Sequence, residues 1–235
     1  MNDAFIRTRM LLGDAAMQRL GRSHVAVFGL GGVGSYVAEC LARSGVGELT
    51  LIDSDTVSES NINRQILALR STVGREKAPV MAERIRDIHP DCVTHPIVGT
   101  YAAEGRERFW GDYDYVADCI DLVSCKLDLI MQAKQRNIPI LSALGTGNKL
   151  DASLLEITDI SRTLGCPLAR VMRKELRRRD IQHLKVVYSP EEAADTEQPE
   201  APPPGRRSVP ASAPWVPPVA GFLMAAEIVK DLIKE

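Results

Sequence analysis

The stretch HVAVFGLGGVGSYVAECLARSGVGELTLID, residues 24–53, decides the fold. HVAVF is a short apolar run with β-branched residues, which is typical of a buried strand. GLGGVGS then opens a helical pattern that Gly45 closes, and ELTLID predicts a second buried strand. A strand, a glycine-rich turn, a helix and a second strand in this order are typical of a nucleotide-binding βαβ unit.

Further strands and helices alternate along the next hundred residues. We expect elements at 77–88 (helix), 93–98 (strand), 115–120 (strand), 124–136 (helix) and 138–143 (strand). Alternation of this kind predicts an α/β fold of the Rossmann-like, doubly wound type, with a mostly parallel sheet and helices on both faces.

The chain changes character after about residue 145. A strand is expected over 153–160, a basic helix over 166–180 and a strand over 183–189. The next stretch, about 189–215, is rich in proline and poor in large apolar residues, so we expect a flexible loop. An amphipathic helix over 219–235 then docks back onto the domain. We interpret 1–235 as one domain, with a nucleotide-binding half (1–150) and a second half (151–235).

Composition excludes several classes of protein. The 235 residues carry 29 Lys and Arg against 31 Asp and Glu, so any contact with a polyanion must use a local basic patch. The five cysteines are widely spaced without a C-x-x-C pair, which argues against a disulfide framework and a structural zinc site. The chain has no apolar run of about 20 residues and its first residues do not resemble a secretory signal, so we expect a cytoplasmic protein without a membrane span.

The glycine-rich turn is the first candidate site. Gly29, Gly31 and Gly34 satisfy G-x-G-x-x-G between a strand and a helix, where backbone N–H groups can approach a phosphate. Asp53 ends the following strand, where a carboxylate can accept a hydrogen bond from a ribose hydroxyl. A role for the glycines in packing alone is the alternative.

Clustered cations favour a nucleoside triphosphate over a dinucleotide. SNINRQ at 60–65 and Lys77 follow Asp53 closely: Arg64 can fork onto two phosphate oxygens, Lys77 supplies a point charge, and Asn61 can orient a phosphate or ribose oxygen. A nicotinamide-dependent dehydrogenase therefore ranks last. Each cation taken singly could also be a solvated surface charge.

Two carboxylates lie at the end of the strand expected over 115–120. Asp118 and Asp121 lie where ligands bind at the carboxyl end of a parallel sheet, so one of them can hold Mg²⁺ between phosphates. Asp121 is the stronger candidate because it lies farther from the strand. The alternative, that either residue caps the following helix, stays open.

These motifs together resemble a known family. GLGGVGS, LIDSD, SNINRQ, VGREK and DCID occur in the order found in the ubiquitin-activating-like adenylyltransferases, the superfamily of ThiF and MoeB. The resemblance implies a homodimer in which Arg7 reaches the partner subunit's ATP site, and it implies that Asp121 is the catalytic, Mg²⁺-linked aspartate. The candidate catalytic residues are Arg7, Arg64, Lys77 and Asp121, and the candidate nucleotide-binding residues are Gly29, Gly31, Gly32, Gly34, Asp53, Asp55, Asn61, Arg64, Gln65 and Lys77.

Within this superfamily the closer likeness is to the tRNA threonylcarbamoyladenosine dehydratases. ALGTGNKLD, ITDISRT, CPLARVMRKELRRR, LKVVYS and GRRSVPASAPWVPPVAGFLMAAEIVKDL (205–232) resemble their second half. The resemblance implies ATP-dependent cyclisation of the modified adenosine through a carboxyl-adenylate. A monovalent cation and a sulfur-relay protein are further components that it leaves open.

Other functions stay open beside this one. An adenylyltransferase that activates the C-terminal glycine of a sulfur-carrier protein is the main alternative, although the paired C-x-x-C motifs of such enzymes are absent. A nucleotide-binding module without turnover is another.

A dense run of cations suggests the tRNA surface. The helix over 166–180 and the proline-rich loop supply the candidates, with a solvated helix face as the alternative reading. The tRNA-binding candidates are Arg170, Arg173, Lys174, Arg177, Arg178, Arg206 and Arg207. Cys166 opens this helix, but packing is favoured over a catalytic thiolate.

Overall fold

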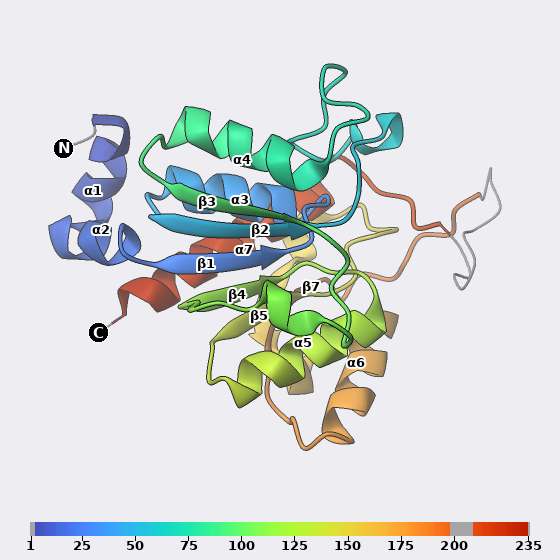
Figure 1. Ribbon diagram of the computed structural model, residues 1–235. Coiled ribbons are helices and arrows are strands. Elements are labelled where there is room, and N and C mark those ends of the chain that lie inside the picture. Colours follow the sequence, from blue (N-terminus) through green and yellow to red (C-terminus); the bar gives the residue numbers. More distant parts are fainter. Residues whose placement is uncertain (1–2, 198–208, 235) are drawn as a thin grey trace.

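A seven-stranded sheet forms the centre of the molecule in the computed structural model, which describes residues 3–197 and 209–234 (Figure 1). The strand order is β3-β2-β1-β4-β5-β7-β6, and only β6 runs antiparallel to its neighbour, which confirms the predicted fold. The strands are β1 (His24–Phe28), β2 (Glu48–Asp53), β3 (Val93–Val98), β4 (Tyr115–Asp118), β5 (Ile140–Ala143), β6 (Glu156–Asp159) and β7 (Lys185–Tyr188).

The α-helices are α1 (Ile6–Leu12), α2 (Asp14–Leu20), α3 (Gly34–Arg43), α4 (Lys77–Ile88), α5 (Val123–Gln135), α6 (Pro167–Arg177) and α7 (Val216–Ile233). The predicted bounds of α4 and β3 are confirmed to the residue. The last helix begins three residues before the predicted position, because Pro217 and Pro218 fill its first turn, where a missing N–H costs no hydrogen bond.

Helix α3 ends as predicted: Gly45 has φ of +88°, in the left-handed region that glycine adopts without strain. The strand predicted over 153–160 is shorter, because residues before it form a 3₁₀ turn in which the Asp151 side chain accepts a hydrogen bond from the Ser153 N–H. Helices α1 and α2 were not predicted.

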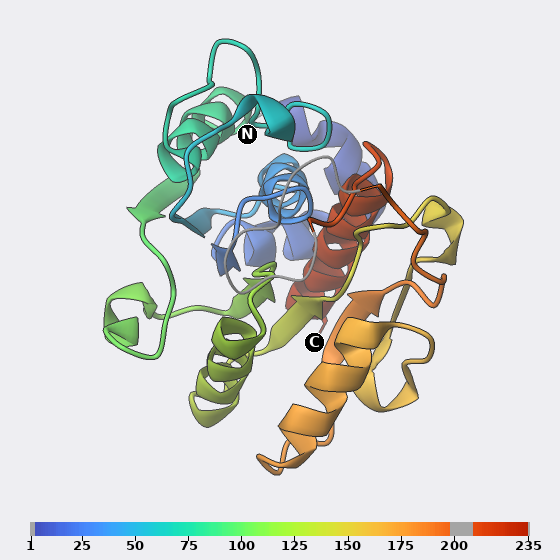
Figure 2. The same cartoon turned by 90° about the vertical axis from the view of Figure 1, so that its right-hand side faces the viewer.

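Successive side chains of β1 are buried on opposite faces of the sheet. Val25 and Val27 point into the core under α3, α4 and α7, whereas Ala26 and Phe28 point into the core under α5 and α6. Figure 2 looks onto the carboxyl ends of the strands and shows these two helical layers on opposite sides. Strands of the second half extend the same sheet, so the two halves share one structure.

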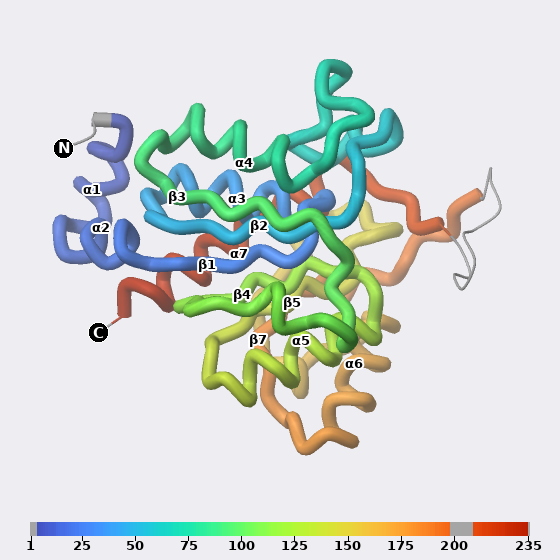
Figure 3. The backbone as a smooth tube through the Cα atoms, viewed as in Figure 1, coloured from blue at the N-terminus to red at the C-terminus, as the bar shows by residue number. Residues whose placement is uncertain are grey.

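The two ends of the sheet differ in what surrounds them. In Figure 3, α1 and α2 lie at the amino ends of the strands, and the connecting loops lie at the carboxyl ends.

The predicted flexible loop is held at both of its ends. Glu191 accepts a hydrogen bond from the Leu150 N–H (2.9 Å), and Ala211 donates its N–H to Asn148 Oδ1 (2.6 Å). Residues 198–208 of that loop lie outside the described residues. Among the helices of the described chain, none has the length and apolarity required to cross a membrane.

Candidate functional site

The glycine-rich turn joins β1 to α3 at the carboxyl edge of the sheet, and its glycines have different roles. A Cβ on Gly29 (φ +89°) would lie 2.8 Å from the Cys119 carbonyl oxygen, and one on Gly34 would lie 1.8 Å from that of Gly29. These two glycines therefore permit close packing. Gly31 is open, since the nearest atom to an added Cβ is Gln65 Nε2 at 3.9 Å.

The glycine-rich turn presents backbone N–H groups at the N-terminus of α3. No side chain caps that end of the helix, although the Ser35 and Tyr36 N–H groups already donate to the carbonyl oxygens of Gly31 and Val33 (both 3.1 Å). The Asp53 carboxylate holds the turn in place by accepting hydrogen bonds from the N–H groups of Leu30 (2.6 Å) and Asp55 (2.8 Å). Burial raises the pKa of Asp53, while the nearby Lys77 lowers it.

Arg64 crosses the open side of the turn. An added Cβ on Gly32 would lie 3.4 Å from Arg64 Cγ, and Arg64 Nη1 donates to the Ser60 carbonyl oxygen (2.9 Å) and to Asn63 Oδ1 (3.0 Å). Burial lowers the pKa of Arg64. No carboxylate pairs with this guanidinium within residues 3–197 and 209–234, so an anion would supply the missing charge.

Lys77 begins α4 and is nearly buried, with 4% of its surface exposed. Its Nζ pairs with Asp55 Oδ2 at 2.8 Å, so the predicted phosphate binder is held by an acidic neighbour. Asn61 has a structural role that the sequence prediction omitted: its Oδ1 accepts the Ser58 N–H in a capping box. Gln65 is buried beside Gly31, and its Oε1 has no partner in the described chain.

The two carboxylates at the carboxyl end of β4 have separate environments. Asp118 is fully buried; it pairs with Lys126 (2.9 Å) and accepts a hydrogen bond from Ser142 Oγ (2.7 Å). Asp121 lies exposed in the turn before α5. The capping alternative does not hold for Asp118, whose carboxylate bonds to the Ile120 N–H, Lys126 and Ser142, and the N-cap position of α5 is Leu122.

Arg7 lies on α1, at the amino ends of the strands, whereas the glycine-rich turn lies at their carboxyl ends (Figure 1). Arg7 is exposed, and the structure does not bring it together with Arg64 and Lys77 of its own chain. Three large apolar side chains of the same helix are exposed as well: Ile6, Met10 and Leu11.

The cysteines are packing residues. Burial raises the pKa of Cys40 and Cys119, which opposes formation of a thiolate. Cys166 is 4% exposed and caps α6, where its Sγ accepts a hydrogen bond from the Ala169 N–H at 3.5 Å.

The predicted cations of α6 divide into three groups. Arg173 is half-buried, and its Nη1 donates to the carbonyl oxygen (2.7 Å) and Oγ1 (2.6 Å) of Thr163, so part of its guanidinium is engaged within the chain. Arg178, the residue directly after α6, pairs with Glu175, which also pairs with Arg179. The remaining cations of the helix are exposed, without an ion pair in the described chain: Arg170, Lys174 and Arg177. Arg206 and Arg207 lie outside the described residues.

Sequence reasoning missed two buried lysines. Lys126 supports the turn that carries Asp121, and it also donates to the Ile120 carbonyl oxygen (2.9 Å). Lys149 follows β5 at the carboxyl edge; it is 3% exposed, and its Nζ has no partner in the described chain. A lone lysine in an amphipathic helix or a polar loop has no sequence signal that distinguishes it from a solvated one.

A model of the ThiF family matches residues 5–235. The chain belongs to the ThiF family. The tRNA threonylcarbamoyladenosine dehydratase of Bacillus subtilis is 39% identical over 242 residues, which cover 98% of this chain and 95% of the relative. A crystal structure of the Escherichia coli enzyme of that name, TcdA, in complex with ATP has a TM-score of 0.85 and 35% identity, and the match covers 99% of this chain and 96% of that one.

The alternative class is more distant. The Sulfur carrier protein ThiS adenylyltransferase of E. coli is 34% identical over 158 residues, or 64% of this chain. The resemblance inferred from the motifs is therefore confirmed, both for the superfamily and for the dehydratase branch within it.

Proposed function

We propose that this protein catalyses the ATP-dependent dehydration of threonylcarbamoyladenosine in tRNA. The observation that carries the proposal is the match, over nearly the whole chain, to dehydratases of that name, one of them solved with ATP. The carboxyl edge of the sheet agrees with it, because an open glycine turn, a helix N-terminus without a side-chain cap and Arg64 form a cradle for phosphates.

The reaction has two steps. The threonyl carboxylate attacks the α-phosphorus of ATP, which forms an acyl-adenylate and releases pyrophosphate. The ureido nitrogen of the same nucleotide then attacks the activated carbonyl carbon, loses its proton and expels AMP as the ring closes. Because nucleophile and electrophile belong to one molecule, orientation supplies much of the acceleration of the second step.

Several side chains would stabilise the first step. We propose that the backbone N–H groups of the glycine-rich turn, Arg64 and Lys77 bind phosphate oxygens, and that Asp53 accepts a hydrogen bond from the ribose. Asp121 would hold Mg²⁺, whose charge offsets the negative charge on the phosphates. Asp121 suits this role because its carboxylate is exposed near the strand end, whereas Asp118 is fully buried.

We infer that the site is composite, with the partner's Arg7 in a homodimer. Helix α1 lies at the wrong end of the sheet to reach its own phosphates, and its exposed apolar residues are suited to an interface.

We place the tRNA surface on the exposed cations of α6. The helix begins beside the carboxyl edge, since an added Cβ on Gly145, just after β5, would lie 3.5 Å from Cys166 Sγ. Arg170, Lys174 and Arg177 would contact phosphates without reading bases.

Nucleoside mass spectrometry tests the proposal. The protein is incubated with ATP, Mg²⁺ and tRNA that carries threonylcarbamoyladenosine, with and without K⁺ to detect a monovalent requirement. The expected product is the modified nucleoside minus one water, with an equal amount of AMP. ATP binding without AMP formation would contradict turnover and favour a nucleotide-binding module.

The second candidate, activation of a sulfur-carrier protein, rests on the more distant relative that covers 64% of the chain. ATP–pyrophosphate exchange separates the two functions: the dehydratase requires the modified tRNA, and the adenylyltransferase requires a carrier protein with a C-terminal glycine.

A further inference from the structure

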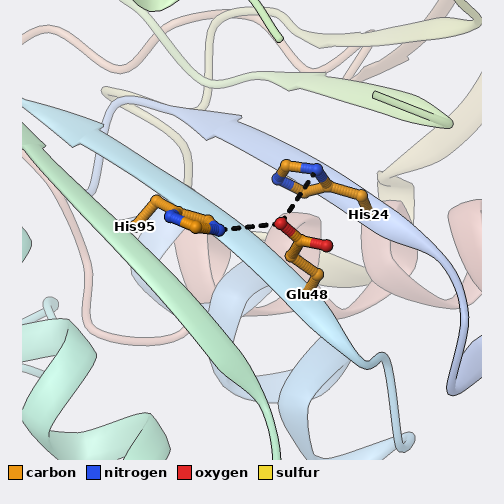
Figure 4. Close-up of side chains that lie close together, drawn as sticks. All are labelled: His24, Glu48 and His95. Atoms are coloured by element: carbon orange, nitrogen blue, oxygen red, sulfur yellow. Dashed lines mark hydrogen bonds and ion pairs between the residues drawn. The ribbon is translucent and has the colours of Figure 1, made fainter. Parts of the chain in front are cut away.

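Two histidines and a glutamate gather at the amino end of the sheet, away from the nucleotide cradle (Figure 4). His24 begins β1, Glu48 begins β2, and His95 belongs to β3. Glu48 Oε1 lies 2.7 Å from His95 Nε2 and 3.4 Å from His24 Nδ1. The three candidate ligand atoms lie within 4.8 Å of one another.

The strand register explains the cluster. His24 is paired with Glu48, and His95 is paired with Thr50, two residues farther along β2. Because alternate residues of a strand share a face, Glu48 and Thr50 point the same way, and both histidines flank them on that face. Neighbouring positions of three adjacent strands therefore converge without any contiguous motif.

We propose that His24, Glu48 and His95 bind a divalent transition metal of the Zn²⁺ type, with water in the remaining coordination position. Two imidazoles and one carboxylate are a common ligand set for such ions. Bonds of about 2.0–2.1 Å at a tetrahedral centre place ligand atoms about 3.4 Å apart. His24 and Glu48 already have this separation, and the His95 side chain, 46% exposed, is free to adjust.

The surroundings orient the most buried ligand. His24 Nε2 lies 2.8 Å from Thr50 Oγ1, where the two atoms can form a hydrogen bond. The other ring nitrogen, Nδ1, faces Glu48 and is therefore the one that would bind the metal. The edge of the Tyr113 ring packs against the His24 ring, with centroids 4.9 Å apart.

The consequence concerns stability rather than catalysis. The ligands come from three strands, including the edge strand β3, so only the folded sheet presents all of them. A metal that binds the folded chain but not the unfolded chain stabilises the fold, and this one would also hold the edge strand β3 against β2. The absence of C-x-x-C pairs argues only against a thiolate site, so it does not bear on this one.

Calorimetric titration with Zn²⁺ tests the site on the full-length protein after treatment with a chelator. The expected result is one tightly bound Zn²⁺ per chain and a rise in Tm that depends on Zn²⁺ concentration. His95→Gln, Glu48→Gln and His24→Gln should each abolish both effects. His183→Gln is the matched control, because His183 also pairs with a carboxylate, Asp159 at 3.3 Å, but lies outside the cluster.

Thr50→Val separates a metal site from a merely structural hydrogen bond. It should weaken Zn²⁺ binding about 10–100-fold, the usual effect of removing a partner of a metal-binding histidine. Circular dichroism verifies that each variant is folded. Co²⁺ provides a second readout, because its visible spectrum reports nitrogen and oxygen ligands, and a thiolate band would contradict this ligand set.

The proposal is wrong if the folded wild-type protein binds no stoichiometric Zn²⁺, or if His95→Gln and His183→Gln behave alike. These measurements follow binding and stability alone, so their outcome is independent of whether the protein dehydrates tRNA.

Discussion

The carboxyl and amino edges of one sheet present different kinds of site. At the carboxyl edge, the cradle is made by contiguous stretches, above all the turn between β1 and α3, and by side chains within 50 residues of it. At the amino edge, residues 24, 48 and 95 meet only because three strands pair in one register. A motif can be recognised before the fold is known, whereas a cluster set by register becomes visible only in the structure.

The largest expected effect concerns the buried charges that support the carboxyl edge. Lys126→Met removes one partner of an ion pair in which both side chains are fully buried. It should lower the free energy of unfolding by about 3–5 kcal/mol, because Asp118 is left buried and unpaired. Urea denaturation measures this, with Arg75→Met as the control, because the Arg75–Glu83 pair is exposed to solvent. Similar shifts in both variants would contradict a supporting role for Lys126.

Asp121→Ala tests whether the carboxyl edge of the sheet is the catalytic site. A carboxylate that acts through Mg²⁺ matters most where charge develops, so AMP formation should fall by about 10²–10³-fold while ATP affinity changes little. Asp112→Ala is the control, because Asp112 is an exposed aspartate outside the nucleotide cradle. Equal losses of binding and turnover in Asp121→Ala would mark this residue as structural.

Mixing Arg7→Ala with Asp121→Ala subunits tests whether Arg7, at the amino edge of one subunit, acts at the carboxyl edge of its partner. If Arg7 acts on the partner subunit, a dimer of one Arg7→Ala and one Asp121→Ala subunit keeps one intact site. An equal mixture in which subunits exchange freely should then recover about a quarter of wild-type activity, from the statistics of a symmetric dimer. Activity no higher than that of either parent, with subunit exchange verified, would show that Arg7 does not act in trans.

The smallest expected effect lies on α6. Changing Arg170, Lys174 and Arg177 to Glu should leave ATP binding intact and weaken tRNA binding. Each lost phosphate contact should also reduce the salt-dependence slope by about 0.9 on duplex. Removing Arg178 and Arg179 should have less effect, because both already pair with Glu175. If the two variants bind tRNA equally well, α6 is a solvated face.

The sequence predicted most of the sheet because apolar periodicity and turn residues are local signals. It placed α4 and β3 to the residue, and the glycine turn and Arg64 converge as expected. It failed where a side chain's partner depends on how separate elements pack together. The contact of Arg173 with Thr163 joins α6 to the turn that precedes it, and the burial of Lys126 depends on packing of α5 against β4. A charge count cannot separate such residues from solvated ones.

Isotope transfer tests most directly whether the carboxylate is activated by adenylation. The tRNA substrate is prepared with ¹⁸O in both carboxylate oxygens of the threonyl group, and the AMP formed by the full-length protein is analysed by mass spectrometry. The carboxylate oxygen that attacks the α-phosphorus leaves with AMP when the ring closes, so each AMP should carry one ¹⁸O. Dehydrated nucleoside accompanied by unlabelled AMP would contradict the carboxyl-adenylate route.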